Sequence, residues 1–153
     1  MAHRIARLFI VLLVLAMAVG AQVSAAYQVK AHGFSVPKAS PDVACRGSDC
    51  TGDDPYIDGC DLTEQALDHK TVFDQYGNSI GVVYLEYSGS CSARWALTIA
   101  NNGGARVSAS IYGASGDNYS SIGVGIVHSL MVGAQLAKAC GTVSGWKTCT
   151  LQK

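Results

Sequence analysis

The chain has 153 residues, and its 11 Lys and Arg balance its 11 Asp and Glu, so the formal net charge is zero. A neutral chain without a basic stretch lacks the charge with which nucleic-acid-binding proteins hold phosphates. The length is enough for one domain and leaves no room for a second once a leader is removed. We therefore expect a single small domain without a nucleic-acid partner.

The first 25 residues have the three parts of a secretory signal peptide. Arg4 and Arg7 give a basic start, residues 8–20 form an apolar run of thirteen, and Val23 and Ala25 stand where a signal peptidase reads small residues. A run of thirteen is too short for a bilayer, which takes roughly 20 residues. The sequence thus predicts a signal peptide over residues 1–25, a secreted protein, and a mature form that does not span a membrane.

Residues 26–41 carry glycine and proline without a sustained period, which predicts a flexible lead-in. Residues 42–153 are expected to form one disulfide-rich β domain, because this part holds every cysteine of the chain: Cys45, Cys50, Cys60, Cys91, Cys140 and Cys149. An even number of cysteines in a short exported chain is typical of a disulfide framework. We therefore expect all six in disulfides.

Residues 42–61, which we call the acidic loop, are rich in turns and hold three of the cysteines. Residues 42–68 contain eight acids and one base, so this part is far more acidic than the rest of the chain. Residues 49–61 of the acidic loop are the predicted contact surface, with Asp53, Asp54 and Asp58 as contact residues, and Trp146 is a further predicted contact residue outside this loop. The sequence Asp61-Leu-Thr-Glu64 has the pattern of a capping box, which predicts a short helix over residues 61–68.

Beyond residue 70 the apolar residues alternate as they do in strands. Strands are predicted at residues 71–74, 80–87, 93–99, 106–112 and 122–126. A turn at Gly77-Asn78 pairs the first two, and an odd-length loop centred on Gly103 places Ile99 opposite Val107. Residues 131–140 are taken as a loop or one helical turn. The expected fold is all-β, a small disulfide-stapled barrel or sandwich of five to seven antiparallel strands with one short helix.

The last hairpin predicts one disulfide. If Ser144-Gly145 is a two-residue turn, Cys140 lies directly opposite Cys149. A local bridge from Cys50 to Cys60 would leave Cys45 for Cys91, but six cysteines allow 15 pairings, so these two remain open.

Three stretches resemble the bacterial, exported YjfA-like proteins. They are Cys50-Thr-Gly-Asp-Asp-Pro55 with Gly59-Cys60; Tyr87-Ser88 with Cys91, Ala93, Trp95 and Ala96; and Met131-Val132, Ala139-Cys140-Gly141 and Cys149-Thr150. The chain departs from that family at Glu86 and Leu97, where its members tend to carry a basic residue, and at residues 63–66, where they tend to have Asp-Ala.

The resemblance implies a secreted domain of unknown function. Such domains also occur outside the membrane in chains whose other end looks like a membrane-tethered transcription regulator, which implies sensing or binding. No catalytic residue comes with the resemblance.

Several other residues have side chains suited to metal binding or ligand contact. An EF-hand starting at Asp54 would place Tyr56 and Gln65 at two ligand positions, so we expect no metal site and no cofactor. Trp95 shares a face with apolar residues and is expected in the core, whereas Trp146 beside the turn is expected at the surface.

The predicted function is a non-enzymatic binding module with an unknown extracellular or cell-envelope partner. One alternative is a small secreted hydrolase that uses His69 or His128, with Glu64 or Glu86 nearby, as acid and base. Another is a secreted inhibitor that presents a loop closed by Cys50 and Cys60.

Overall fold

The structure, a computed structural model, describes residues 42–133 and 135–153. The predicted signal peptide (1–25) and lead-in (26–41) lie outside the described residues. The elements are the 3-10 helices η1 (Gly47–Cys50) and η2 (Cys60–Thr63) and the strands β1 (Glu64–Phe73), β2 (Ser79–Ser88), β3 (Ala93–Ala100), β4 (Arg106–Gly113), β5 (Asn118–Val124), β6 (Ile126–His128), β7 (Val132–Gly133), β8 (Ala137–Val143) and β9 (Trp146–Cys149). Within the described residues, no helix has the length and apolar character needed to cross a membrane.

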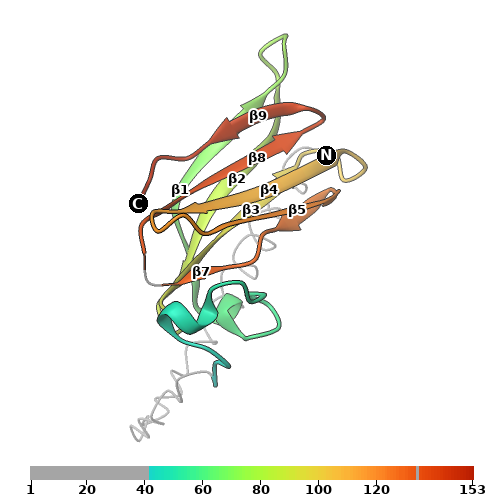
Figure 1. The fold of residues 1–153 in the computed structure, drawn as a ribbon. Coiled ribbons are helices and arrows are strands. Elements are labelled where there is room, and N and C mark those ends of the chain that lie inside the picture. The colour runs from blue at the N-terminus through green and yellow to red at the C-terminus, as the bar shows by residue number, and fades with distance from the viewer. Residues whose placement is uncertain (1–41, 134) are drawn as a thin grey trace, which may run out of the picture. The chain divides into compact units, whose positions relative to one another are not determined.

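The strands form two antiparallel sheets (Figure 1). Sheet A has the order β1-β2-β3-β6, and β7 also pairs with β3. Sheet B has the order β5-β4-β8-β9. The predicted all-β class is confirmed, and of the two predicted architectures it is the sandwich, because the sheets of the described residues do not close into a barrel.

The main core lies between the two sheets. Strand β4 shows why: its residues alternate between exposed and buried, so that one side of the pleat faces the other sheet. The fully buried residues of this core come from both sheets and are mostly small or β-branched; they include Val72, Val83, Leu85, Ala96, Val107, Ala109, Ile111 and Val143. Each face of the sandwich that points away from this core is an outer face.

The predicted short helix is only partly correct. A 3-10 helix covers Cys60–Thr63, but residues from Glu64 onward belong to β1, so a helix over 61–68 is wrong beyond its first turn. Extended pairing of Glu64 with Ser88 and of Ala66 with Glu86 provides backbone hydrogen bonds to β2. The capping-box pattern predicts a local helix start and contains no information on this long-range pairing. Nine strands are described instead of five to seven; seven of them have at least four residues.

The β1–β2 hairpin exists with a longer loop than predicted. Asp74 Oδ1 accepts hydrogen bonds from the backbone N–H groups of Tyr76 and Asn78, at 2.8 and 2.9 Å. This side chain organises a loop over residues 74–78, and Phe73 consequently pairs with Ser79. The predicted turn placed Phe73 opposite Val82, but Val82 pairs with Thr71. The register was therefore wrong by two residues before the irregularity at residues 72 and 73, a shift that leaves those side chains on the same face, and by three at Phe73.

The predicted strands at 93–99 and 106–112 are present, but their pairing was wrong. β3 pairs with β2, β6 and β7 in sheet A, whereas β4 pairs with β5 and β8 in sheet B. The chain crosses from one sheet to the other between them. The apolar residues Trp95, Leu97 and Ile99 of β3 point to the outer face of sheet A, whereas Ala96 and Ala100 face the shared core. The alternation of β3 therefore did not indicate which strand it pairs with.

The final hairpin is confirmed. Ser144 and Gly145 have φ of 50° and 90°, as a two-residue turn of the hairpin type requires, and Val143 pairs with Trp146. Cys140 lies opposite Cys149, with 4.0 Å between their Cα atoms, and the two form a disulfide. The stretch 131–140 is mainly extended, with β7 and the start of β8, so the predicted helical turn is absent from its described residues.

The apolar face of the strand predicted at 122–126 points to solvent. Ile122, Val124 and Ile126 are exposed, while Gly123 and Gly125 face inward. Gly125 has a φ of 76°, and a Cβ there would lie 2.6 Å from the Gly103 carbonyl oxygen. This tight crossing ends β5 and begins β6, and it splits the predicted strand between the two sheets.

Candidate functional site

The acidic loop covers one end of the outer face of sheet A. It forms a second core there, separate from the core between the sheets, in which Trp95 and Met131 pack against buried cysteines. Trp95 is therefore buried as predicted, but under the acidic loop. Backbone hydrogen bonds fix the loop to the segment before β7, from Gly52 N to the Met131 carbonyl and from Met131 N to the Asp53 carbonyl.

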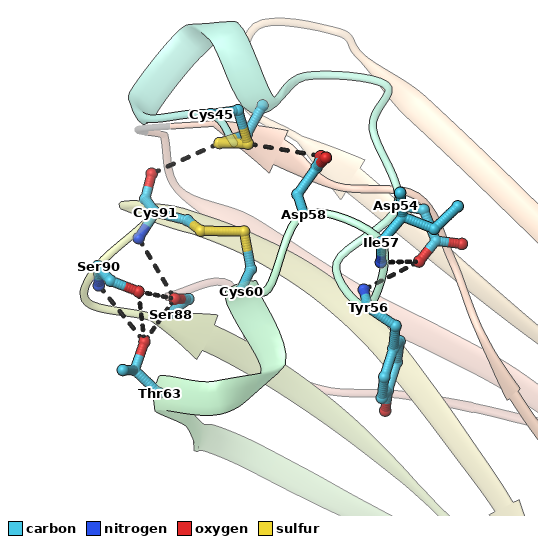
Figure 2. The surroundings of a disulfide bond; sticks show 11 residues. Cys45, Asp54, Tyr56, Ile57, Asp58, Cys60, Thr63, Ser88, Ser90 and Cys91 are labelled. Atoms are coloured by element: carbon cyan, nitrogen blue, oxygen red, sulfur yellow. Dashed lines mark hydrogen bonds between the residues drawn. A yellow bond between two sulfur atoms is a disulfide. The ribbon is translucent and has the colours of Figure 1, made fainter. Parts of the chain in front are cut away.

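Two disulfides fasten the acidic loop. Cys45 pairs with Cys50 inside the loop, and Cys60 pairs with Cys91 beside β3 (Figure 2). The pairings of Cys50 with Cys60 and of Cys45 with Cys91 were therefore wrong. All four sulfur atoms lie within 4.8 Å of one another, so every pairing among them would bring together the same parts of the chain. The inhibitor alternative loses its premise, because no Cys50–Cys60 bridge closes the loop.

Three hydroxyl groups support this attachment. Thr63 Oγ1 lies 2.7 Å from Ser88 Oγ and 2.6 Å from Ser90 Oγ, as Figure 2 shows. Ser88 Oγ also accepts a hydrogen bond from the backbone N–H of Cys91. The hydroxyls join η2 to the turn between β2 and β3 next to the Cys60–Cys91 disulfide, so the end of the acidic loop is held by covalent and polar contacts together.

Asp54 organises the part of the loop that reaches the sheet. Its Oδ1 accepts hydrogen bonds from the backbone N–H groups of Tyr56 and Ile57, and its Oδ2 lies 3.1 Å from Nε2 of His128. Burial raises the pKa of Asp54, but the hydrogen bonds from His128 and the two N–H groups outweigh it and hold this pKa below its usual value. The carboxylate thereby fixes Tyr56 over His128, with ring centroids 4.5 Å apart.

Replacement of Asp54 by alanine is expected to lower the free energy of unfolding by about 1–2 kcal/mol at pH 7, because two backbone donors and His128 lose their acceptor. Since the pKa of Asp54 is lowered by folding, this difference should disappear as the pH falls below the ordinary value of 3.8. Urea unfolding measures this difference in the free energy of unfolding. Asp53→Ala, an exposed neighbour, is the control and should stay within about 0.5 kcal/mol.

One row of side chains crosses the outer face of sheet A. His69 on β1 lies opposite Tyr84 on β2, and their rings are 5.9 Å apart. Tyr84 lies opposite Leu97 on β3, which in turn lies opposite His128 on β6. The two predicted histidines therefore share this face but stand three strand spacings apart, about 14 Å. They are too far apart to act together on one bond.

The next row contains a buried carboxyl group. Glu86 lies opposite Ala66 on β1 and opposite Trp95 on β3, and it is only 6% exposed. Desolvation, followed by the negative charge of Glu64, raises the pKa of Glu86 to about 7. No hydrogen bond from the described residues offsets this burial. The indole N–H of Trp95 is also buried without an acceptor in the described part of the chain. The indole N–H is thus a fully buried donor without a partner, whereas the Glu86 carboxyl oxygens, which have no partner from the described residues, are not among the fully buried atoms.

The electrostatic potential at this face is negative. Partial burial, and after it the charges of Glu64, Asp61, Glu86 and Asp54, raise the pKa of the Tyr56 hydroxyl. Four acids thus act on one aromatic side chain that is 44% exposed. We call the surface made by Tyr56, Tyr84, Glu86, Leu97 and His128 the acid–aromatic site. It arises where the acidic loop meets the exposed half of the outer face.

The other predicted contact residues lie elsewhere. Asp53 is exposed on the acidic loop, and Asp58 is half-buried with Oδ2 3.7 Å from Cys45 Sγ. Trp146 is exposed, as predicted, but β9 carries it on sheet B beside the turn at residues 144–145. That turn lines a hollow with Ser79 and Asn101, at the end of β2 opposite the acidic loop. The structure therefore does not bring Trp146 and the acidic loop together.

Glu86 and Tyr84 are the site residues that the sequence identified least clearly. A signal was present: Glu86 is two residues from Tyr84 and four from Val82, so in a strand it must share their apolar face. An acidic side chain on an apolar strand face is either covered by another part of the protein or kept for function. The alternation along β2 does not show which strands lie beside Glu86.

The comparisons with known proteins place this surface within a family. A family model described as "Protein of unknown function (DUF2690)" matches residues 48–140, more than half of the chain. The chain belongs to this family. No curated protein and no solved structure is significantly similar to it. The part that matches the DUF2690 model contains every residue of the acid–aromatic site and ends before Trp146.

Proposed function

We propose that this DUF2690 protein is exported and acts outside the cytoplasm as a binding module, with the acid–aromatic site as its contact surface. The observation that carries this proposal is the Glu86 side chain, which is mostly buried and whose carboxyl group has no hydrogen-bonding or basic partner among the described residues. Buried polar groups are normally hydrogen-bonded, because an unmade bond costs about 1–3 kcal/mol. A ligand that pairs with the Glu86 carboxyl group would supply the missing partner, whereas the Trp95 indole is fully buried and out of a ligand's reach.

Export is supported by the cysteines. All six are in disulfides, a state that persists in oxidising compartments and is rare in the cytosol. The leader at residues 1–25, the single domain at residues 42–153 and the resemblance to the YjfA-like proteins belong to the same proposal. In it, the domain faces the cell exterior and meets a partner of the cell envelope or the medium.

Binding is favoured over catalysis by the arrangement of the histidines. His69 and His128 lie on different edges of sheet A, and Nε2 of His128 is already held by Asp54. Two histidines that act as acid and base must both reach the same substrate bond, and side chains on opposite edges of the sheet cannot do so. The exposed faces of Tyr56 and Tyr84 provide contact area for a ligand without such a requirement.

One observation favours a hydrolase as the second candidate. A carboxyl group with a pKa of about 7, such as Glu86, suits general acid–base catalysis near neutral pH. In that case Glu86 would transfer the proton and the His128–Asp54 pair would orient the substrate. Turnover of envelope polymers or peptides by the protein, lost in Glu86→Gln, would establish this candidate in place of a binding module.

The binding proposal is tested with protein recovered from culture supernatant, whose mass should correspond to cleavage after Ala25. Immobilised protein is mixed with purified cell-envelope fractions, and the bound material is quantified. Tyr56→Ala with Tyr84→Ala should reduce retention at least about tenfold, the order of effect expected for exposed aromatic anchors.

The matched control removes two aromatic residues from sheet B, by Trp146→Ala with Tyr112→Ala. This variant should retain envelope material as the original protein does. Equal retention by the original protein and both variants would show that the acid–aromatic site is not the contact surface. Loss in the sheet B variant alone would assign the contact to the other sheet.

A further inference from the structure

Glu86 and Glu64 are neighbours on the outer face of sheet A. Glu86 pairs with Ala66, and Glu64 lies two residues before Ala66 on the same strand, opposite Ser88. Side chains two residues apart in a strand point to the same face. The two carboxyl groups therefore face the same side of the sheet, one buried and one exposed.

These acids have no basic partner in the part of the chain that the structure describes. The ion pair found there joins His128 to Asp54. Arg94 lies near Glu86 in the sheet, but it stands on the inner face, with its guanidinium 5.0 Å from the centre of the Tyr87 ring. A buried charge is costly unless it is paired with an opposite charge. A partner of Glu86 would lie next to the aromatic rings of the acid–aromatic site.

The aromatic rings restrict the kind of ligand that fits. Tyr84 precedes Glu86 on the same face of β2, and Tyr56 lies on the far side of Leu97 over His128. Faces of tyrosine rings attract organic cations, and the four acids near Tyr56 repel anions. A calcium ion would need six to eight oxygen ligands, more than one buried carboxyl group can supply.

We propose that the acid–aromatic site binds an organic ammonium group, such as the side-chain amine of a lysine residue in a peptide, and that Glu86 is its counter-ion. This proposal rests on the proposed function and specifies its ligand. The amine donates hydrogen bonds to the Glu86 carboxylate, its methylene stem lies on Leu97, and Tyr84 and Tyr56 flank it. Glu64 adds negative charge at the opening of the site.

Binding of a cation should be coupled to loss of a proton from Glu86. At a pH below about 7 Glu86 holds a proton and cannot pair with an ammonium ion, so the affinity should rise with pH through this range. The other titratable groups on this part of the outer face are Glu64 and His69 on β1, Tyr84 on β2 and His128 on β6, together with Asp54, Tyr56 and Asp61 in the acidic loop. Of the two histidines, His128 is paired with Asp54, and His69 lies beside Tyr84 at the β1 edge.

The test uses two short peptides that differ in one group, acetyl-Gly-Lys-Gly-amide and acetyl-Gly-norleucine-Gly-amide. The second has the same apolar stem without the amine. Binding to the protein is followed at pH 6 and pH 8 through the indole N–H signal of Trp95, which lies opposite Glu86. We expect the lysine peptide to shift this signal, with at least about a tenfold higher affinity at pH 8, and the norleucine peptide to leave it unchanged.

Two variants complete the test. Glu86→Gln keeps the shape of the side chain and should weaken binding of the lysine peptide at pH 8 at least about tenfold. Asp49→Asn removes an exposed acid of η1 outside the site and should change it less than about twofold, since exposed charges are largely screened. Equal binding of the two peptides, or unchanged binding in Glu86→Gln, would overturn the proposal.

Failure of this inference is distinguishable from failure of the proposed function. If envelope material still depends on Tyr56 and Tyr84 while the lysine peptide does not bind, the site is a binding surface for another ligand class. If the envelope material does not depend on these tyrosines but the peptide binds through Glu86, the ammonium site exists without the proposed contact. Each result answers one of the two questions.

Discussion

Replacing Cys60 and Cys91 with alanine is expected to lower the free energy of unfolding by about 4 kcal/mol, the largest loss among the three disulfides. The bond joins residues separated by 31 positions, whereas the separations for Cys140–Cys149 and Cys45–Cys50 are 9 and 5. In the chain-entropy description, a bridge that closes a longer loop removes more freedom from the unfolded chain, and the two shorter loops correspond to about 2–3 kcal/mol each.

The same change should loosen the acidic loop over sheet A. Trp95 is fully buried beneath this loop and beside the Cys60–Cys91 disulfide. In a Trp146→Phe background Trp95 is the one tryptophan left, so its emission reports on this core alone. We expect its emission maximum to move to longer wavelength in the Cys60→Ala/Cys91→Ala variant, and urea unfolding to give the stability.

The matched control for this prediction is Cys140→Ala with Cys149→Ala. That disulfide lies on the last hairpin of sheet B, away from Trp95. Its loss should lower stability by about 2–3 kcal/mol and leave the Trp95 emission unchanged. An equal loss of stability in both variants, with no change of emission in either, would show that the acidic loop is held by its other contacts.

Glu86→Gln is expected to stabilise the protein at pH 8. The pKa of Glu86 rises from 4.5 to about 7 on folding, so the folded chain holds a proton that the unfolded chain has released. Stability therefore falls as the pH rises from 4.5 to 7, and above that range the ionised side chain costs about 3 kcal/mol. Glutamine resembles the protonated form and carries no such cost.

Urea unfolding at two pH values measures this effect. The gain in the free energy of unfolding should be below about 1 kcal/mol at pH 5 and about 3 kcal/mol at pH 8. Asp49→Asn should show no difference between the two pH values beyond about 0.5 kcal/mol. If Glu86→Gln destabilised the protein at pH 8, the ionised carboxylate would have a partner that stabilises it. Stabilisation combined with loss of peptide binding is the combination expected for a residue kept for function.

The final hairpin was predictable because every contact in it is local. A two-residue turn fixes the register, and the register alone places Cys140 opposite Cys149. The strands themselves were also predictable, since a period of two in the apolar residues indicates a strand whichever side of the sheet those residues face. The exposure of Trp146 followed from its place beside the turn.

The remaining disulfides could not be read from the sequence. Four sulfur atoms gather within 4.8 Å, so composition and loop length favour no pairing over another. The order of strands was equally hidden, because the alternating apolar residues of β3 face outward and those of β4 face the core, and alternation alone does not distinguish the two cases. The burial of Trp95 was predicted, but the sequence did not show that the acidic loop, and not the second sheet, covers it.

The sequence by itself determined the all-β class, the disulfide framework and the acidic character of residues 42–61, because each depends on composition or on spacing along a short stretch. Tertiary structure alone decided that Asp54 meets His128, that Tyr56 stands over the outer face of sheet A, and that Glu86 is buried beside Trp95. These contacts join residues far apart in the chain. The burial and the electrostatic environment of a side chain depend on every element packed around it. A pattern within one short stretch of sequence contains no information on the other elements.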